Sequence, residues 1–275
     1  ALARRAAALR TRGAALAVVL DHPAAVPALA EAASAAGVSL DVLVDVDVGL
    51  RRTGVASPEA AVEVARAIAA SPSLRLRGVQ GYGGHLQHMA GLESRRSATE
   101  TATDRLRAAV EAIRAAGLSV EVITGGGTGT IAADLALGLF TELQPGSYVF
   151  MDREYRDALA DDEDGRFETA LQIDATVISA NAGPFVTVDA GLKAFATDAG
   201  VPVPLGQHAG SSYFFFGDEQ GGLTRTAEVP LTLGDRVAFM APHCDPTVDR
   251  YDRLWFVRGA AVVERVPVEG RGRSQ

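Results

Sequence analysis

Short apolar runs of strand length alternate with alanine-rich helical runs over about the first 152 residues, and this alternation constrains the fold more than any other feature. The strand candidates lie at residues 14–22, 40–49, 76–85, 119–127 and 141–152, and the helix candidates at residues 23–37, 57–71, 97–117 and 131–138. Strands that alternate with helices are typical of βα units, which build a parallel sheet. We therefore predict an α/β fold with part of a (β/α) barrel, of about five or six strands where a closed barrel has about eight.

The sequence changes character after about Glu168. Runs rich in β-branched and aromatic residues follow one another between Gly, Pro and Asp turns, and no long helical pattern remains. This pattern is typical of a mostly antiparallel sheet. We therefore predict two domains, a partial (β/α) barrel over residues 1–167 and a β-rich C-terminal domain over residues 168–275.

The bulk composition disfavours several classes of partner. The chain has 275 residues, of which 48% are hydrophobic, a formal net charge of -8 and a pI of about 5.2. An acidic surface disfavours binding to nucleic-acid backbones and to anionic membrane surfaces, and no apolar run reaches the roughly 18 residues of a membrane span. The single cysteine, Cys244, excludes an intramolecular disulfide framework and fits a reducing compartment such as the cytoplasm.

A glycine-rich run, TGGGTGT at Thr124–Thr130, lies between a predicted strand and a predicted helix. Consecutive glycine amides at such a junction bind phosphate groups well, whereas a tight turn that needs positive φ angles selects the same residues. The run lacks the lysine of a P-loop and the spacing of a Rossmann fingerprint. The next strand candidate ends in Gly146, Ser147 and Tyr148, and two such neighbouring strand ends match the phosphate site found late in many barrels.

The stretch VDVDVGLRRTGV places Asp45 and Asp47 on the same side of a predicted strand and follows them with Arg51 and Arg52. From the residues alone we favour buried carboxylates that neighbouring barrel groups satisfy. The alternative is an arginine presented at the barrel mouth to an anion or to a ring nitrogen.

The stretch QGYGGHLQHM carries two histidines, His85 and His88, in a glycine-rich loop at a predicted strand end, together with Gln80, Tyr82 and Gln87. One histidine alone is more often structural. Two histidines in such a loop are better candidates for acid–base catalysis or for metal binding.

The stretch HCD places His243 and Asp245 two residues apart, with Cys244 between them. On an extended chain the imidazole and the carboxylate face one way and the thiol the other, so a metal held by the first two excludes the third. Two protein ligands leave such a site open to water and substrate. The alternative is a turn in which Asp245 accepts backbone N–H groups before Pro246.

Six motifs, in this order along the chain, closely resemble those of the D-threonine aldolase family: DVGLRRTGV, GVQGYGGHLQH, TGGGTGT, ELQPGSYVFMD, VDAGLKAFATD and PHCDPTVDRYD. The resemblance runs from about residue 14 to about residue 272. It implies a barrel of the alanine racemase type, a β domain, pyridoxal 5'-phosphate as cofactor and a divalent metal ion (Mn, Mg, Co or Zn). It also implies a homodimer that cleaves D-β-hydroxy-α-amino acids to glycine and an aldehyde by a retro-aldol reaction.

Motif by motif, the resemblance assigns roles to individual residues. Arg52 resembles the arginine that faces the pyridine nitrogen, and His88 resembles the general base that takes the β-hydroxyl proton of the substrate. His243 and Asp245 resemble the metal ligands, with Cys244 as a bystander. The residues that would contact the cofactor ring or its phosphate are Gln80, Tyr82, Gly127, Thr128, Gly129, Gly146, Ser147 and Tyr148.

The family binds its cofactor covalently through a lysine near the N-terminus, on the first barrel strand, and the chain has no lysine in that region. Its single lysine, Lys193, lies in the β-domain motif, to which we assign only structural support. The sequence begins with Ala and enters directly into helical periodicity. We therefore expect the C-terminal portion of a longer enzyme, with the first barrel strands missing and with no activity of this chain alone.

Three other functions compete with D-threonine cleavage. A β-hydroxyaspartate aldolase shares the HCD motif, and a cation for the distal carboxylate would distinguish it. A D-serine dehydratase is expected to bind zinc through His and Cys at positions i and i+2, whereas Asp245 occupies position i+2 in this chain. The last alternative, from a different class, is an inactive fragment that lacks the Schiff-base lysine.

Overall fold

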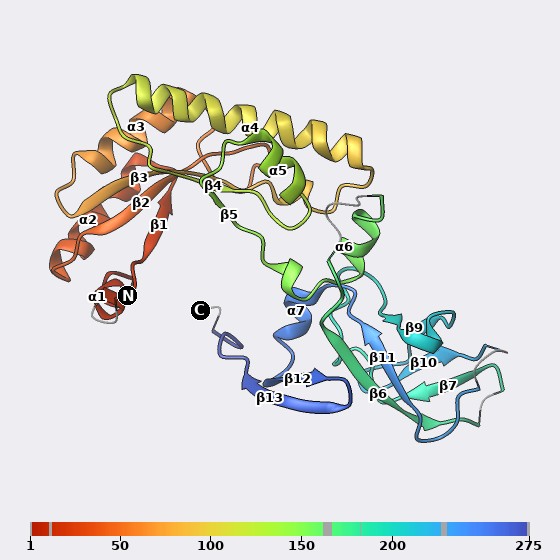
Figure 1. The fold of residues 1–275 in the computed structure, drawn as a ribbon. Coiled ribbons are helices and arrows are strands. Elements are labelled where there is room, and N and C mark those ends of the chain that lie inside the picture. The colour runs from red at the N-terminus through yellow and green to blue at the C-terminus, as the bar shows by residue number, and fades with distance from the viewer. Residues whose placement is uncertain (1, 11–12, 162–166, 182, 227–229, 274–275) are drawn as a thin grey trace. The chain divides into compact units, whose positions relative to one another are not determined.

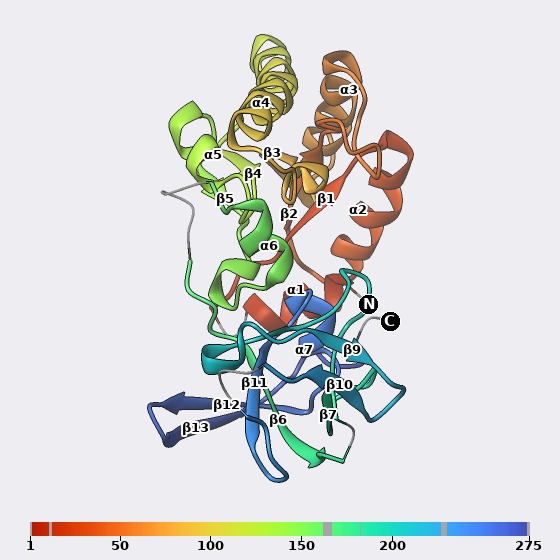
Figure 2. The same ribbon diagram turned by 90° about the vertical axis from the view of Figure 1, so that its right-hand side faces the viewer.

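The computed structural model describes residues 2–10, 13–161, 167–181, 183–226 and 230–273. Contacts between residues divide the chain into two units. The first contains Ala1–Gly146, and the second contains Ser147–Ala160 and Arg166–Gln275. Figures 1 and 2 show the elements of each unit from two directions.

A parallel sheet of five strands forms the centre of the first unit (Figure 1). The strands pair in chain order, and every pair is parallel. They are β1 (Ala17–Leu20), β2 (Leu40–Asp45), β3 (Leu74–Gly81), β4 (Val122–Gly125) and β5 (Glu142–Leu143). The predicted parallel α/β sheet is confirmed, because each apolar run that alternates with a helix joins the same sheet.

Helices α2, α3 and α4 lie along one face of this sheet in both views. The helical elements of the unit are α1 (Leu2–Arg10), η1 (Pro23–Ala25), α2 (Val26–Ala35), α3 (Pro58–Ala69), η2 (Gly84–Leu86), α4 (Leu92–Ala115) and α5 (Ile131–Leu137). Helix α3 begins where the Ser57 hydroxyl accepts the Ala60 N–H, an N-cap. Its buried residues, Ala61, Val64, Ala65 and Ile68, recur at helical spacing and form one apolar stripe. No helix in the described part of the chain combines the length and apolarity needed to cross a bilayer.

Element boundaries differ from the prediction at several places, of which three are the most informative. The strand predicted over residues 141–152 is wrong beyond Leu143, because Pro145 and Gly146 interrupt the ladder before the 3-10 turn η3 (Ser147–Val149). Strand β2 ends at Asp45, four residues before its predicted end. Helix α4 begins at Leu92, five residues before its predicted start.

The second unit is built on an antiparallel sheet with the strand order β8-β11-β6-β7-β10-β9, and β12 and β13 form a separate hairpin. Phe195, Tyr213, Leu223 and Phe239 lie in its core. The strands are β6 (Gln172–Ser179), β7 (Phe185–Val188), β8 (Val203–Pro204), β9 (Tyr213–Phe215), β10 (Gly221–Thr224), β11 (Arg236–Met240), β12 (Arg253–Arg258) and β13 (Ala261–Pro267). The helical elements after η3 are α6 (Arg153–Ala158), η4 (Gly206–His208) and α7 (Cys244–Val248).

Helix α6 belongs to the second unit, although the sequence places its residues before the predicted boundary at 167/168. Asp152 explains this grouping, because its side chain caps α6 by accepting the Tyr155 N–H at 3.0 Å and also accepts the Cys244 N–H at 2.7 Å. The Arg153 N–H donates to the Ala241 carbonyl at 3.0 Å. These bonds join the start of α6 to the start of α7.

Candidate functional site

Polar side chains at the carboxyl ends of β2 to β5 form a continuous hydrogen-bonded row, which we call the polar ladder. The Gln80 amide donates to Asp45 at 3.2 Å, and the Gln144 amide donates to the Gln80 oxygen at 3.2 Å. Gln144 also donates to the Thr124 hydroxyl at 3.0 Å, and Thr124 donates to Glu142 at 2.8 Å. Since the carboxyl edge is where (β/α) proteins place their chemistry, this row is the floor of the candidate site.

The sequence identified only part of the polar ladder. Gln80 was predicted as a cofactor contact, and the expected satisfaction of Asp45 by a neighbouring group is confirmed by its bond to Gln80. Thr124, Glu142 and Gln144 were missed as site residues. Their place at the ends of adjacent predicted strands was the available signal, because such ends meet at one edge of a parallel sheet.

Arg52 and Tyr82 lie beside the polar ladder. The guanidinium carbon of Arg52 is 5.4 Å from the centroid of the Tyr82 ring, within the range of a cation–π interaction. Both side chains line a small pocket together with Asp45 and Gln80. The structure therefore groups three residues predicted to contact the cofactor ring, which are Arg52, Gln80 and Tyr82.

Asp47 does not continue strand β2, and the prediction that it shares a strand face with Asp45 is wrong. Its carboxylate accepts the N–H groups of Gly49 at 2.8 Å and Arg51 at 2.9 Å. Burial raises the pKa of Asp47, but the two amide bonds and the charges of Arg105 and Arg51 together lower it below the ordinary value. These bonds hold Arg51 at a positive φ of 57°, a strained conformation for a residue with a Cβ, and so shape the turn that presents Arg52.

The glycine-rich loop between β4 and α5, residues 125–130, is fully buried. Two of its amides already have partners inside the protein, since Gly127 donates to the Thr130 hydroxyl at 3.2 Å and Gly129 to the Gln87 oxygen at 2.9 Å. A phosphate bound by this loop would therefore have to contact the other N–H and hydroxyl groups of the loop. The assignment of Gly127, Thr128 and Gly129 stays a prediction.

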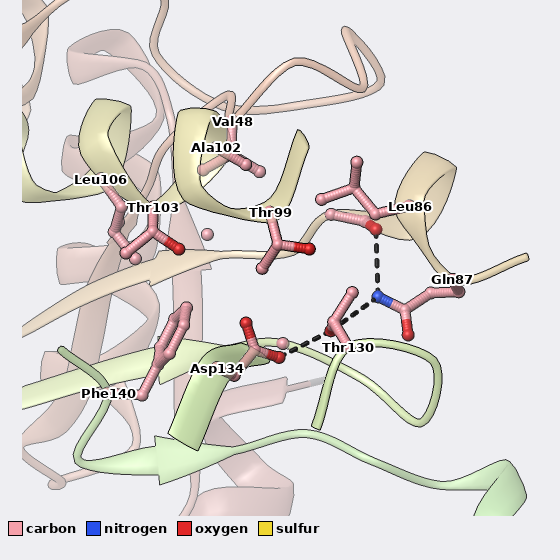
Figure 3. Close-up of a pocket in the computed structure, with 13 residues that line it drawn as sticks. Val48, Leu86, Gln87, Thr99, Ala102, Thr103, Leu106, Thr130, Asp134 and Phe140 are labelled. Carbon is pink, nitrogen blue, oxygen red and sulfur yellow. Dashed lines mark hydrogen bonds between the residues drawn. The ribbon is translucent and has the colours of Figure 1, made fainter. Parts of the chain in front are cut away.

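Asp134 is a buried carboxylate beneath this loop, and no role for it was predicted (Figure 3). It is 3% exposed and accepts the Thr130 hydroxyl at 2.6 Å. Burial raises its pKa to about 6, opposed by hydrogen bonds from Thr130 and from the Gly127 amide. Asp134 is therefore ionised at the pH of most cells and neutral in mild acid.

The two histidines of the loop after β3 are both exposed. His85 lies in η2, and its imidazole is so close to Gly49 that a Cβ there would be 3.2 Å from Nε2. His88 follows the buried Gln87 directly. The loop therefore offers an exposed imidazole at the carboxyl edge, as the prediction for His88 requires, and its role stays a prediction.

The donor set of the first unit suits a phosphorylated aromatic cofactor. It combines a guanidinium, an aromatic ring and amide groups at one edge with a hydroxyl-bearing glycine loop. The first unit has no lysine side chain for covalent attachment, because the only lysine of the sequence is Lys193 in the second unit. The residues fit non-covalent binding of the ring and phosphate.

In the second unit, His243 lies between carboxylates. Its Nδ1 is 2.6 Å from Asp198 Oδ2 and 4.0 Å from Glu154 Oε2, and its Nε2 is 3.4 Å from Asp245 Oδ2. Hydrogen bonding to Asp245 raises the pKa of His243 to about 9, burial lowers it, and hydrogen bonding to Asp198 raises it further. The pKa values of Asp245 and Asp198 fall because each is paired with His243.

The spacing of His243 Nε2 and Asp245 Oδ2 fits a divalent metal ion. Two donors that each lie about 2.0–2.2 Å from a metal are roughly 3.0–3.5 Å apart at octahedral or tetrahedral angles. Among the described residues no group of three or more His, Cys, Asp or Glu side chains forms a complete ligand cage. The pair therefore has the spacing expected of two metal ligands, and both the ligand assignment and the metal stay predictions.

The HCD segment is not extended, contrary to the assumption in the sequence argument. His243 is the extended N-cap residue of α7, and Cys244 and Asp245 begin the helix. Cys244 is fully buried, and burial raises the pKa of its thiol well above the usual range. Because only the thiolate binds metals well, Cys244 is a poor ligand despite standing between the two candidates.

The predicted phosphate contacts after β5 have other neighbours. The Ser147 hydroxyl is buried and donates to Asp245 Oδ2 at 3.3 Å. The Tyr148 ring lies 5.4 Å from the Phe167 ring, and Gly146 is exposed. Ser147 therefore supports a candidate metal ligand, a role that the sequence did not indicate, and the phosphate role of the three stays a prediction.

Comparison with known proteins gives two family matches and several close relatives. Residues 3–154 match the alanine racemase, N-terminal domain, and residues 170–257 match a serine dehydratase domain. The chain is 37% identical over 274 residues to 3-hydroxy-D-aspartate aldolase of Paracoccus denitrificans (strain Pd 1222), covering 98% of this chain and 70% of that protein. It is 35% identical over 268 residues to D-threonine aldolase of Arthrobacter sp, covering 96% of this chain and 69% of that protein.

The crystal structure of D-threonine aldolase from Filomicrobium marinum has the same fold. It superimposes with a TM-score of 0.91 at 35% sequence identity, over 95% of this chain and 71% of that chain. The predicted family resemblance and the alanine-racemase-like fold are thereby confirmed.

The buried Asp134 predicts a pH dependence of stability. Its pKa rises from an ordinary 3.8 to about 6 on folding, so its favourable contribution is fully present below about pH 3.8 and is lost as the pH rises through 6. As the pH rises from 4 to 8, the free energy of unfolding of Asp134→Asn should therefore increase relative to that of the unmodified protein, by on the order of 2–3 kcal/mol. Hydrogen exchange of the β3 and β4 amides at both pH values measures this difference.

Asp104→Asn is the matched control, because Asp104 is an exposed acid that pairs with Arg107 on α4. Its effect should stay the same across this pH range. An equally constant effect of Asp134→Asn would contradict the assigned role of burial.

Lys193 should not form a covalent bond with pyridoxal phosphate. Its ammonium is 2.5 Å from Glu219 and 3.7 Å from Asp218, and the hydrogen bond to Glu219 raises its pKa, so the amine stays protonated and is a poor nucleophile. After incubation with pyridoxal phosphate and borohydride reduction, peptide mass spectrometry should find Lys193 unmodified. A pyridoxyl adduct on Lys193, lost in Lys193→Ala, is the contrary result.

Proposed function

The chain belongs to the alanine-racemase-like family that includes D-threonine aldolase and 3-hydroxy-D-aspartate aldolase, and from this premise we propose that it serves in the retro-aldol cleavage of D-β-hydroxy-α-amino acids. The products are glycine and an aldehyde. D-Threonine is the proposed substrate. A 3-hydroxy-D-aspartate is the alternative, supported by the relative with 37% identity.

His243 and Asp245 carry this proposal. They are 3.4 Å apart, and they would hold a divalent ion that lowers the pKa of the β-hydroxyl of the substrate. Asp245 stands where a dehydratase is expected to carry a thiolate ligand, and the adjacent Cys244 is buried and protonated. This ligand set therefore favours aldol cleavage over dehydration.

The first unit would hold the cofactor and the general base. Arg52, Gln80 and Tyr82 would contact the ring, and an arginine at the ring nitrogen would leave that nitrogen unprotonated. The residues proposed to hold the phosphate are Gly127, Thr128, Gly129, Gly146, Ser147 and Tyr148. Pyridoxal phosphate, when bound, supplies an electron sink for the charge left at Cα.

His88 is the proposed base for the β-hydroxyl proton. It is exposed at the carboxyl edge of the sheet, and the residue directly before it, Gln87, is buried and anchors the loop. Imidazole is the side chain used most often as a general base, which supports this role for His88.

Covalent attachment of the cofactor requires an amine that these residues do not supply. Lys193 is protonated and paired with Glu219. The chain by itself is therefore proposed to bind pyridoxal phosphate non-covalently and to turn over slowly or not at all. A homodimer in the cytoplasm completes the proposal, on the family resemblance and on the lone, reduced Cys244.

His88→Ala should reduce the cleavage of D-threonine by roughly 10²–10⁴-fold, the usual contribution of a general base. The assay follows glycine formation by the complete protein with pyridoxal phosphate and Mn²⁺ added. His85→Ala is the matched control, because His85 is a second exposed imidazole in the same loop. If His85→Ala loses turnover and His88→Ala does not, the base is assigned to the wrong histidine.

Asp245→Ala should weaken the binding of Mn²⁺ by more than about a hundredfold, because it removes one of two protein ligands. Cys244→Ser should change the affinity by no more than about threefold, since a protonated thiol contributes little to a metal site. Titration calorimetry with Mn²⁺ measures both affinities without reference to turnover. The reverse ranking would support a thiolate site.

A further inference from the structure

Gln87 is among the most buried of the described polar side chains at the carboxyl edge of the sheet, and it has no role in the proposed chemistry. It is 1% exposed, whereas His85 and His88 in the same loop are exposed. Burying an amide costs free energy unless each of its groups is hydrogen-bonded, so its partners decide why it is buried.

Those partners join two loops that are far apart in the sequence. The Gln87 oxygen accepts the Gly129 N–H at 2.9 Å. The Gln87 amide nitrogen donates to the Gly83 carbonyl at 3.1 Å and to the Thr130 hydroxyl at 3.3 Å. One side chain therefore spans the histidine loop after β3 and the glycine-rich loop after β4, as Figure 3 shows.

The glycines of the second loop leave room for Gln87, because they have no Cβ. A Cβ on Gly127 would overlap the Gln87 side-chain amide, and a Cβ on Gly129 would overlap the Gln87 main-chain carbonyl. A Cβ on Gly126 would overlap the Asp134 carboxylate. Part of the reason for glycine in TGGGTGT is therefore close packing against Gln87 and Asp134.

Thr130 extends the contact into the interior. Its hydroxyl accepts the Gly127 N–H at 3.2 Å and donates to Asp134 at 2.6 Å. Gln87, Thr130 and Asp134 thus form one chain of hydrogen bonds, which we call the loop clamp. The loop clamp accepts hydrogen bonds from the N–H groups of Gly127 and Gly129.

We propose that Gln87 is a positioning residue, which holds the glycine-rich loop in one conformation and so sets the affinity of the protein for the phosphate of its cofactor. A segment this rich in glycine has many conformations when it is not held, and phosphate binding would have to select one of them. The loop clamp makes that selection in advance. Because the same side chain holds the histidine loop, cofactor binding and the placement of His88 share one support.

This inference rests on the proposed function, because it takes pyridoxal phosphate as the ligand. The test compares the dissociation constants of pyridoxal 5'-phosphate and pyridoxal, measured by fluorescence titration of the whole chain. The two ligands share a ring and differ by the phosphate. Their affinity ratio therefore reports the phosphate contact and is insensitive to a general loss of folded protein.

Gln87→Met keeps the length of the side chain and removes all three hydrogen bonds. It should weaken pyridoxal phosphate by about tenfold to a hundredfold, the loss expected for a charge-assisted hydrogen bond, and leave pyridoxal nearly unchanged. Gln144→Met is the matched control, because Gln144 is a glutamine of the polar ladder whose amide donates to Gln80 and Thr124. It should weaken both ligands by the same factor.

Thr130→Val supplies a second route to the same question. It removes the hydroxyl that joins Gln87 to Asp134 but keeps the shape of the side chain. If the loop clamp acts as a unit, the variant that combines Gln87→Met with Thr130→Val should lose less affinity for pyridoxal phosphate than the product of the fold-losses of the two single variants. Independent effects would mean that Gln87 does not act through Thr130.

The outcomes separate the inference from the function on which it rests. If the unmodified chain binds neither ligand, the cofactor assignment fails. If it binds pyridoxal phosphate better than pyridoxal and Gln87→Met keeps that ratio, the role of Gln87 alone is overturned. If Gln87→Met does not fold, Thr130→Val still decides the question, because a preserved ratio there overturns the loop clamp.

Discussion

At the carboxyl edge of the parallel sheet, polar side chains must find hydrogen-bond partners, and the rest of the first unit depends on how they do so. Four neighbouring strands, β2 to β5, end there with polar groups. Asp45 and Thr124 are buried and therefore need partners within the protein, whereas Gln80 and Gln144 are half-buried. Side-chain bonds from strand to strand meet the requirement: Gln80 reaches Asp45, and Gln144 reaches both Gln80 and Thr124. A row that is fully bonded is also rigid, so the surface offered to a ligand exists before the ligand arrives.

The sequence predicted the sheet well because the evidence for it is local. Apolar runs that alternate with amphipathic helices are visible within windows of about ten to twenty residues, and the order of the elements then fixes a parallel sheet. Predictions failed where a local signal competed with the pattern. Pro145 and Gly146 ended β5 early, and α7 began at Cys244, so that the HCD segment is the start of a helix and not a strand. The two candidate ligands still converge, because His243 is an extended N-cap and Asp245 lies in the first turn.

The site residues likewise divide into those that the sequence marks by their chemistry and those that only the fold reveals. Histidines, arginines and glycine runs could be named from the sequence because their chemistry marks them. Asp198 and Gln144 could not, because each gains its role from a partner in another part of the chain. Asp134 could not, because its role comes from its burial in the fold. Asp198 is 45 residues from His243, and Gln144 is 64 residues from Gln80. Gln87 is the intermediate case: the sequence drew attention to its loop, but only the fold shows that it is buried and bridges two loops.

Negative charge gathers around His243 in the second unit. Three carboxylates, those of Glu154, Asp198 and Asp245, lie within 4.0 Å of one imidazole. A single imidazolium balances at most one of them, and because Asp198 and Asp245 are exposed, solvent screens part of the repulsion that remains. Asp198 binds Nδ1 and so turns Nε2 toward Asp245, which is how a carboxylate orients a metal-ligating histidine. A divalent ion between Nε2 and Asp245 would reduce this excess negative charge, whereas a thiolate at position 244 would add to it. Burial raises the pKa of the Cys244 thiol, and the nearby carboxylates of Asp152 and Asp245 raise it further, so a thiolate at this position is disfavoured.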